Sequence, residues 1–360
     1  MTEERKRILE MVENGSLSAR EALTLLEALD SAEETSKKKE EKLLNDLVIA
    51  VNKEKKTDGP TGSSTKEKLM EFISSTIKKV KDMDLDFQLG QHADVSHVFQ
   101  HTGVTVQQLE LDISNGKVEI IPWDQQDVRI ECNVRVYRTE KQEEARTMFL
   151  KNTTFSIEND KLRFSTQFKW MKADTILYIP KNEYEKLSVR IFNGGLTVKG
   201  LQVEDFKFKT ANGKLNVEQL YSQSLEAETA NGSISIVNSY SRKIEAETIN
   251  GSITFKGDSQ KLDLQSLNGN IQCDVTGDQC ETLHAKTVTG SVVLAIGTER
   301  SLSGELKSNL GSFKVNQMGI TILEEKSELV QKYMRFSKKG LNPHMLHVFA
   351  DTKTGSISLK

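Results

Sequence analysis

The sequence predicts a mainly β protein: a single-chain β-solenoid built from rungs of about 19 residues, with a small α-helical region at its N-terminus. The first observation is a repeated unit, Thr-x-Asn-Gly-x-apolar-x-apolar. Its clearest copies are TANGKLNV from Thr210, TANGSISI from Thr229, TINGSITF from Thr248 and SLNGNIQC from Ser266. A unit that recurs at a short, fixed period is typical of a solenoid or another repeat architecture.

The second observation is the spacing of the glycine within each copy. Weaker copies extend the series, and the glycines of all copies are Gly116, Gly194, Gly213, Gly232, Gly251, Gly269, Gly290, Gly311 and Gly355. From Gly194 to Gly311 the successive steps are 19, 19, 19, 18, 21 and 21 residues. Asn-Gly between alternating runs also signals a two-residue hairpin. Independent hairpins have no reason to keep one length, whereas the laps of a coil stack equivalent residues about 4.8 Å apart.

The third observation is the alternation of apolar and polar residues on both sides of each Asn-Gly corner. Around Gly232, for example, Leu225 and Ala227 precede the corner, and Ile234 and Ile236 follow it. This period-2 pattern points one side of each strand into a core. We expect equivalent Asn and Thr side chains to form ladders along the axis. We also expect glycine at each corner to permit a left-handed backbone.

The ends of a solenoid expose unpaired strand edges and therefore need caps. In the predicted solenoid domain, residues 91–360, we expect strands up to residue 138, a helix from about 139 to 150, and further strands up to Pro180. At the far end, we predict a helix at residues 320–335 and interpret it as an insertion or a cap. We expect residues 347–360 to form a final rung of the solenoid.

The first 90 residues divide into three predicted segments. Residues 1–30 form a helical hairpin broken at Asn14-Gly15, and residues 31–65 form a charged, flexible linker with a short helix at Leu43–Val51. Residues 66–90 contain an amphipathic helix. A hairpin of this length buries too little surface to be stable alone, so it docks on a second copy, a partner or another part of the chain.

The predicted amphipathic helix combines an apolar face with a basic charge. Phe72, Ile73 and Ile77 share the face, next to Lys78 and Lys79, and residues 66–81 carry five lysines against two glutamates. Such a helix caps the solenoid or packs on a partner, lies on an anionic bilayer, or pairs with a second copy in a coiled coil.

Two outward faces of the middle rungs are candidate binding surfaces. The first is acidic and would attract a cationic ligand, or it is a solvated face that resists edge-to-edge pairing; its residues are Glu226, Glu228, Glu245, Glu247 and Asp263. The second carries hydroxyl groups that would suit a sugar or ice, although plain solvation explains them better; its residues are Ser233, Ser235, Ser252 and Thr254.

Several function classes are excluded or disfavoured by composition and motifs. The net charge of -3 gives no global electrostatic case for nucleic-acid binding. No catalytic motif stands in a suitable context, so we expect no enzyme, no catalytic residue and no cofactor. His92, His97 and His101 lack a convincing further ligand, so we expect no metal site. Cys273 occupies the position at which other rungs carry an inward-pointing apolar residue, so we expect it to be a core residue.

The combination of motifs resembles a known group of bacterial proteins. The stretch RILEMVENGSLSAREALTLLEAL resembles a SHOCT-like helical domain, and the TxNGxIxI rungs resemble the adhesin-like β-solenoid family of the DUF4097 type. Both domains occur together in the YvlB/LiaX group of Firmicutes proteins. The resemblance implies a role in cell-envelope stress, in which a relative senses antimicrobial peptides and modulates a three-component signalling system.

Two functions from different classes follow. The first is a non-enzymatic regulatory or sensor scaffold whose wall binds a cationic peptide or a protein partner, such as a membrane signalling component. Its N-terminal helices would mediate peripheral membrane contact or homo-oligomerisation. The alternative is a polysaccharide-binding or adhesive module. The charged start MTEERKRILE lacks the apolar core of a signal peptide, so we expect a cytoplasmic protein. Membrane association, and surface exposure by a non-classical route, stay open as alternatives.

Overall fold

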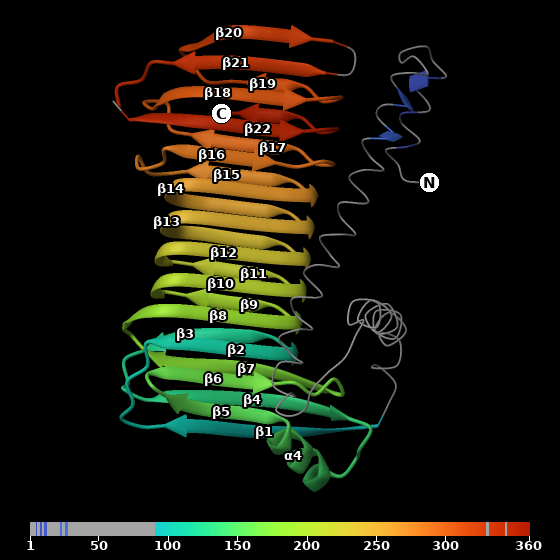
Figure 1. Ribbon diagram of the computed structural model, residues 1–360, viewed down its shortest axis with the longest axis vertical. Coiled ribbons are helices and arrows are strands. Elements are labelled where there is room, and N and C mark those ends of the chain that lie inside the picture. The colour runs from blue at the N-terminus through green and yellow to red at the C-terminus, as the bar shows by residue number, and fades with distance from the viewer. Residues whose placement is uncertain are drawn as a thin grey trace, which may run out of the picture.

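The structure is a computed structural model that describes residues 91–328, 331–342 and 344–360, together with eight helical residues nearer the N-terminus. Those eight are Arg5, Ile8, Met11, Val12, Ala22, Leu23, Leu26 and Glu27. The predicted single-chain β-solenoid is confirmed: the chain winds around one axis as an elongated stack with strands in two facing walls (Figure 1). The predicted linker at 31–65 and amphipathic helix at 66–90 lie outside the described residues.

The first wall contains the strands that lead into each Asn-Gly corner, and most of them pair in parallel. In spatial order they are β5 (Thr153–Glu158), β6 (Lys161–Thr166), β2 (Gln108–Asn115), β8 (Glu183–Asn193), β10 (Gln202–Asn212), β12 (Tyr221–Asn231), the later parts of β13 (Ile234–Asn250) and β14 (Ile253–Asn268), β16 (Thr282–Lys286), β22 (Met345–Thr352), β18 (Ser301–Ser308), β21 (Lys332–Lys338) and β20 (Ile320–Ser327).

The second wall contains the strands that leave each corner. In spatial order they are β1 (His92–His101), β4 (Val128–Tyr137), β7 (Met171–Pro180), β3 (Val118–Trp123), β9 (Leu196–Lys199), β11 (Leu215–Glu218), the first parts of β13 and β14, β15 (Ile271–Val275), β17 (Val292–Ile296), β23 (Ile357–Leu359) and β19 (Phe313–Val315).

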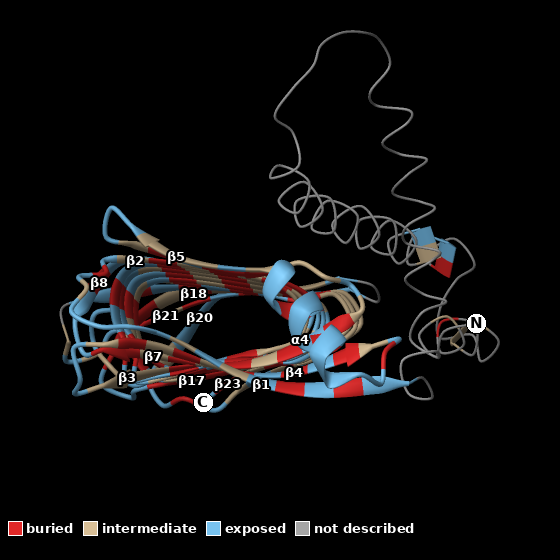
Figure 2. Ribbon diagram, turned by 90° about the horizontal axis from the view of Figure 1, so that it is seen from below, coloured by how far each residue is buried: buried red, intermediate tan, exposed pale blue. Residues whose placement is uncertain are grey.

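The core lies between the two walls and follows the predicted alternation. Phe206 and Phe208 of β10 and Phe255 of β14 are almost completely buried, as is Cys273 at an equivalent inward position. Seen along the axis from the β1 end, the walls enclose this core and α4 lies across its near side (Figure 2). Each lap therefore buries its apolar side chains against those of the laps above and below, which stabilises the stack as a whole.

The predicted side-chain ladder of asparagines is confirmed at the corners. The Asn231 Nδ2 donates to Asn212 Oδ1 at 2.9 Å, and the Asn250 Nδ2 donates to Asn231 Oδ1 at 2.8 Å. The same bond repeats along the axis through Asn115, Asn193, Asn212, Asn231, Asn250 and Asn268. Each rung thus fixes the register of the next through a side-chain amide.

The threonines that precede each corner do not form the predicted ladder with one another. Each buried hydroxyl instead donates to the glycine carbonyl of the neighbouring rung: Thr229 Oγ1 to Gly213 O at 3.1 Å, and Thr248 Oγ1 to Gly232 O at 2.9 Å. The bond satisfies a hydroxyl that would otherwise be buried without a partner.

The reason for glycine at the corner also differs from the prediction. Only Gly116 and Gly194 of the repeated glycines have a left-handed φ, 134° and 151°. A Cβ atom at Gly232 would instead overlap the carbonyl group of Gly213 in the adjacent rung. Close backbone approach between laps, rather than backbone handedness, therefore requires glycine at this position.

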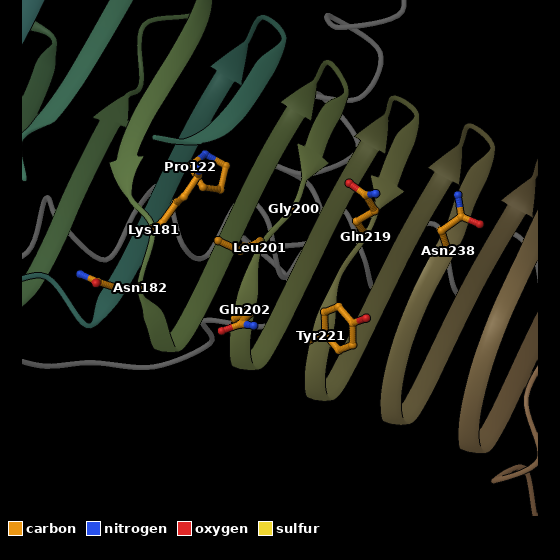
Figure 3. A pocket seen from close by; sticks show the side chains of 9 residues that line it. All are labelled: Pro122, Lys181, Asn182, Gly200, Leu201, Gln202, Gln219, Tyr221 and Asn238. Atoms are coloured by element: carbon orange, nitrogen blue, oxygen red, sulfur yellow. The ribbon is translucent and has the colours of Figure 1, made fainter. Parts of the chain in front are cut away.

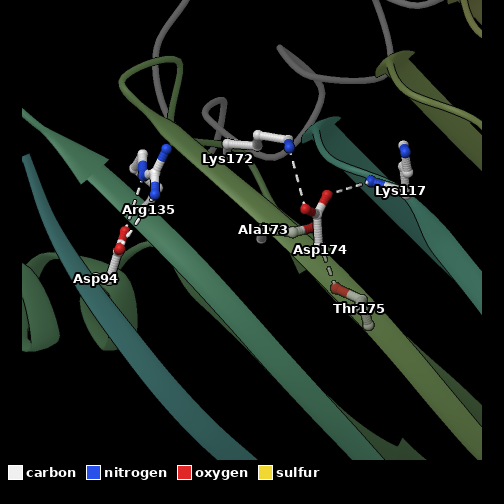
Figure 4. Close-up of polar contacts among 7 residues, drawn as sticks. All are labelled: Asp94, Lys117, Arg135, Lys172, Ala173, Asp174 and Thr175. Atoms are coloured by element: carbon white, nitrogen blue, oxygen red, sulfur yellow. Dashed lines mark hydrogen bonds and ion pairs between the residues drawn. The ribbon is translucent and has the colours of Figure 1, made fainter.

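The first end of the stack is closed by antiparallel strands and one helix. The predicted helix is confirmed as α4 (Gln142–Lys151), which buries Ala145 and Phe149 against the end of the core. Across β1 and β4, Arg135 Nε donates to Asp94 Oδ1 at 2.8 Å, and on β7 Asp174 accepts the backbone N–H of Lys117 and pairs with Lys172 (Figure 4). The Arg135–Asp94 pair thus joins the edge strand β1 to its neighbour β4.

The far end is closed by strands, so the helix predicted for residues 320–335 is wrong. The segment forms the hairpin of β20 and β21, and β21 pairs antiparallel with β18. The alternation typical of a strand prevails because Met334 and Phe336 point into the end of the core. The backbone of β18 also gains a partner for its open edge.

The last rung in the sequence is not the last rung in space. As predicted, Val348 and Ala350 of β22 take inward positions, in register with Leu283 and Ala285 of β16. However, β22 also pairs in parallel with β18, so the C-terminal rung is inserted between the rungs of Gly290 and Gly311.

Candidate functional site

The structure brings the five predicted acidic residues together on the outward side of the first wall. Glu226 of β12 is in register with Glu245 of β13, which is in register with Asp263 of β14. Glu228 is likewise in register with Glu247. Neighbouring strands are about 4.8 Å apart, so like charges face each other directly, which destabilises a sheet. We call these five residues the acidic patch.

Lysines approach the acidic patch mainly from one side. Lys207 Nζ lies 2.6 Å from Glu226 Oε2, and Lys209 Nζ lies 2.7 Å from Glu228 Oε1. Both lysines belong to the adjacent rung, β10. On β13, Lys243 Nζ contacts Glu245 Oε1 at 2.6 Å. These lysines thus contact Glu226, Glu228 and Glu245 of the patch.

Burial and crowding change the protonation of the central pair of carboxyl groups. Burial raises the pKa of Glu228 above its ordinary value, and the neighbouring Glu226 carboxylate raises it further, against the opposing effect of Lys209. Burial also raises the pKa of Glu226, but hydrogen bonding and charge interaction with Lys207 outweigh it, so the net shift is downward. The ionised form of Glu228 is thus held at a cost in free energy.

We expect Glu228→Gln to remove part of the pH dependence of folding. A carboxyl with a raised folded-state pKa stabilises the protein fully below its unfolded pKa of about 4.3, and that contribution is lost as the pH rises through the folded-state pKa. At pH 7 the variant should be as stable as the wild type or more stable, by less than about 1 kcal/mol. Urea unfolding at a series of pH values measures the difference.

The matched control is Glu226→Gln, because the pKa of Glu226 is lowered. Its contribution is present above the unfolded pKa and is lost as the pH falls through the folded-state pKa, so this variant should be less stable at pH 7. If both variants shifted the stability curve in the same direction, this assignment of the two carboxyl groups would be wrong.

The predicted hydroxyl face lies along the second wall and the corner that leads to it. Ser235 of β13 is in register with Thr254 of β14, while Ser233 and Ser252 sit at the corners, and all four are at least partly exposed. The equivalent outward positions on β9, β11 and β15 are also polar, namely Thr197, Asn216 and Gln272. The small polar groups of this face point to solvent.

The structure adds a groove that sequence reasoning missed. It has a volume of about 510 Å³ and lies at the corner opposite the asparagine ladder (Figure 3). Three of the residues that line it, Gly200, Gln219 and Asn238, occupy equivalent positions in consecutive rungs. Each has a left-handed backbone, with φ of 69°, 55° and 50°. Tyr221 projects beside it and is 58% exposed. The sequence predicts this groove only weakly, because three different residue types occupy the turn position with the left-handed backbone.

Other candidate residues take structural roles. The ring of His97 on β1 packs against Phe99 and Phe149, with centroids 4.4 and 5.8 Å away, and burial lowers the pKa of His97. Burial raises the pKa of the Cys132 and Cys280 thiols to about 12. Within the described residues, no group of three or more His, Cys, Asp or Glu side chains is placed to hold a metal ion.

The predicted membrane or partner residues Phe72, Ile73, Ile77, Lys78 and Lys79 lie outside the described residues. Among the helices that the structure does describe, none combines the length and the apolar character needed to cross a bilayer. Nearer the N-terminus, Ile8 and Ala22 are buried in a small cluster with Met11, Val12 and Leu26, and Leu310 of the solenoid packs against it.

Comparison with known proteins identifies two family models. The model described as "Toastrack DUF4097" matches residues 106–349, and the SHOCT-like domain model matches residues 3–34. In Bacillus subtilis (strain 168), the uncharacterized protein YvlB is 48% identical over 368 aligned residues, which cover 100% of this chain and 99% of that protein.

Solved structures with low sequence identity are also similar. A candidate adhesin from Bacteroides fragilis is 12% identical, with 74% of this chain and 97% of that chain covered and a TM-score of 0.36. A candidate adhesin from Parabacteroides distasonis is 10% identical with the same coverage and TM-score. A candidate cell adhesion protein from Clostridium sporogenes is 8% identical, with 74% and 99% covered and a TM-score of 0.23.

Proposed function

The chain belongs to the toastrack DUF4097 family, and on this premise we propose that it is a non-enzymatic regulatory scaffold of the bacterial cell-envelope stress response. In this proposal the acidic patch binds a cationic peptide or the basic segment of a protein partner. The joint presence of the SHOCT-like and toastrack domains, as in the group that the sequence resembles, supports the regulatory role.

The observation that carries the proposal is the placement of like charges on three consecutive strands. Where Lys207 and Lys209 face Glu226 and Glu228, the wall pairs opposite charges and gains stability. In the next two rungs, Glu245, Glu247 and Asp263 continue the acidic columns where lysines would have been favourable. A cationic ligand would relieve this repulsion on binding, so the residues that destabilise the free wall favour the complex.

Titration of the full chain with a fluorescent oligolysine peptide tests the proposal. We expect the variant Glu245→Gln/Glu247→Gln/Asp263→Asn to bind about tenfold more weakly than wild type, with a smaller salt dependence, because both depend on the same charges. The matched control is Ser235→Ala/Thr254→Ala on the hydroxyl face, which should bind like wild type. Equal affinity for all three proteins would contradict the proposal.

Peripheral membrane contact through residues 66–90 belongs to the same proposal. It is supported by the excess of lysines and by the apolar set of Phe72, Ile73 and Ile77. Flotation of the full chain with anionic vesicles provides the readout, and binding of this kind should fall as the salt concentration rises.

The groove at Tyr221 favours polysaccharide binding as a second candidate function. An exposed aromatic ring with several amide side chains nearby, here Gln202, Gln219 and Asn238, offers the stacking and hydrogen-bonding groups that a sugar ring uses. A glycan array decides between the candidates: specific retention that Tyr221→Ala abolishes would favour the adhesive module, and absence of retention would favour the peptide-binding scaffold.

A further inference from the structure

A line of apolar residues runs along the outside of the Asn-Gly corners. Each of these residues directly precedes the asparagine of an Asn-Gly corner, and we call them the corner stripe: Phe192, Ala211, Ala230, Ile249 and Leu267. They form a cluster of their own, separate from the core between the walls. The corner stripe therefore follows the solenoid axis across five consecutive rungs.

The corner stripe is buried although its side chains point outward. Ala211 follows the inward Thr210 on β10, so by strand alternation its Cβ lies on the same side as Lys209. Ala211 and Ala230 are nevertheless only 1% exposed, and Ile249 is 3% exposed. The described apolar side chains packed against them are Phe192 and Leu267, which cover the two ends of the line. The outward side of the corner stripe needs another apolar cover that runs along the axis.

The position of the N-terminal helices shows where this cover would begin. Leu310, next to the corner residue Gly311, packs against the cluster of Ile8 and Ala22 near the far end of the stack. The described chain resumes at Gln91, immediately before β1, at the opposite end of the stack (Figure 1). The described residues on either side of the segment 28–90 therefore lie at opposite ends of the stack.

We infer that the apolar segment Leu43–Val51 of this same chain docks along the corner stripe. From Gly311 to Gly232 the corner column makes five steps, through Gly355, Gly290, Gly269 and Gly251, or about 24 Å at 4.8 Å per step. The 16 steps along the chain from Glu27 to Leu43 also span about 24 Å if the segment is helical, at 1.5 Å per residue. This places Leu43 beside Ala230.

The apolar pattern of the segment fits such a line. Leu43, Leu47 and Val51 recur every four residues, so in a helix they share one face, about 6 Å apart along the axis. The small side chains of Ala211 and Ala230 leave room for these larger ones. The segment would thus connect the SHOCT-like helices to the solenoid through a packed interface. In this inference the corner stripe is a contact surface between two parts of the same chain.

Thiol accessibility in the full chain tests this docking. The native cysteines are buried, so a new cysteine at the corner stripe gives the measurable reaction. We expect Ile249→Cys to react slowly with a maleimide, and to react about tenfold faster or more when Leu43→Asp/Leu47→Asp/Val51→Asp is added. Ala230→Cys gives the same test with a smaller change of volume.

The matched control is Ser235→Cys on the hydroxyl face, which should react quickly and equally in both backgrounds. Circular dichroism of each variant identifies any that fail to fold, in which case the Ala230→Cys pair decides the result. An unchanged rate at the corner stripe after the triple substitution would overturn the inference. Protection that disappears on roughly hundredfold dilution would also overturn it, because the cover would then be a second copy.

Discussion

Gly232→Ala is expected to destabilise the protein by about 4 kcal/mol or more, or to prevent it from folding. The added Cβ would overlap the carbonyl oxygen and carbon of Gly213 in the adjacent rung. Two backbones pack against each other at this point, and no flexible side chain can move aside. Relief would require separation of two laps and loss of their hydrogen bonds, including the one from Gly213 N to Asn231 O at 3.0 Å. Denaturant unfolding followed by circular dichroism measures the change.

Gly297→Ala is the matched control for this substitution. A Cβ there would meet only Arg300 Cγ at 3.9 Å, and its φ is not in the left-handed region. We expect a change within about 1 kcal/mol, since neither crowding nor backbone strain opposes the methyl group. Similar losses of stability for the two variants would show that close approach between laps is not the reason for the corner glycines.

The fold was predictable because its stabilising contacts recur along the sequence. A solenoid places equivalent residues one above another, so a single rung with Asn231, Gly232, Ile234 and Ile236 predicts the environment of every other rung. The asparagine ladder follows from the same argument. The reason for glycine did not follow, because a repeated glycine in a sequence does not distinguish close backbone approach from a left-handed φ.

The order of the rungs at the far end was not predictable from spacing. The copy at Gly355 has the same Thr-x-x-Gly-Ser pattern as the copy at Gly290, so it fits equally at the end of the stack or between two other rungs. Its insertion depends on the pairing of β18 with β22 on one side and with β21 on the other. These pairings join segments that are distant in the sequence, so local spacing does not predict them. The same pairing turned the segment at 320–335 into strands.

The candidate site was predicted in part. Outward positions follow from alternation, so the residues of the acidic patch were identifiable, and their register on β12, β13 and β14 brings them together. The balance between burial and lysine contact that raises the pKa of Glu228 but lowers that of Glu226 depends on side-chain positions. The groove at Tyr221 depends on the shape of a turn and needed the structure.

Deletion of one complete rung is expected to leave the fold intact, whereas a deletion one residue shorter should destabilise it much more. Thr229 and Thr248 are equivalent residues in adjacent rungs, 19 positions apart. Removal of residues 230–248 joins Thr229 to Ile249 and keeps every inward side chain inward. Removal of residues 230–247 leaves an extra residue in the strand, which turns the side chains on one side of the junction to the wrong face.

The most direct test of the stacked-coil account is therefore the thermal unfolding of these two deletion variants, followed by circular dichroism. The account predicts a cooperative β-sheet transition for the variant lacking residues 230–248, at a lower temperature than wild type because one interface between rungs is lost. It predicts a transition at a much lower temperature still for the variant lacking residues 230–247. The same behaviour from both variants, folded or unfolded, would contradict it.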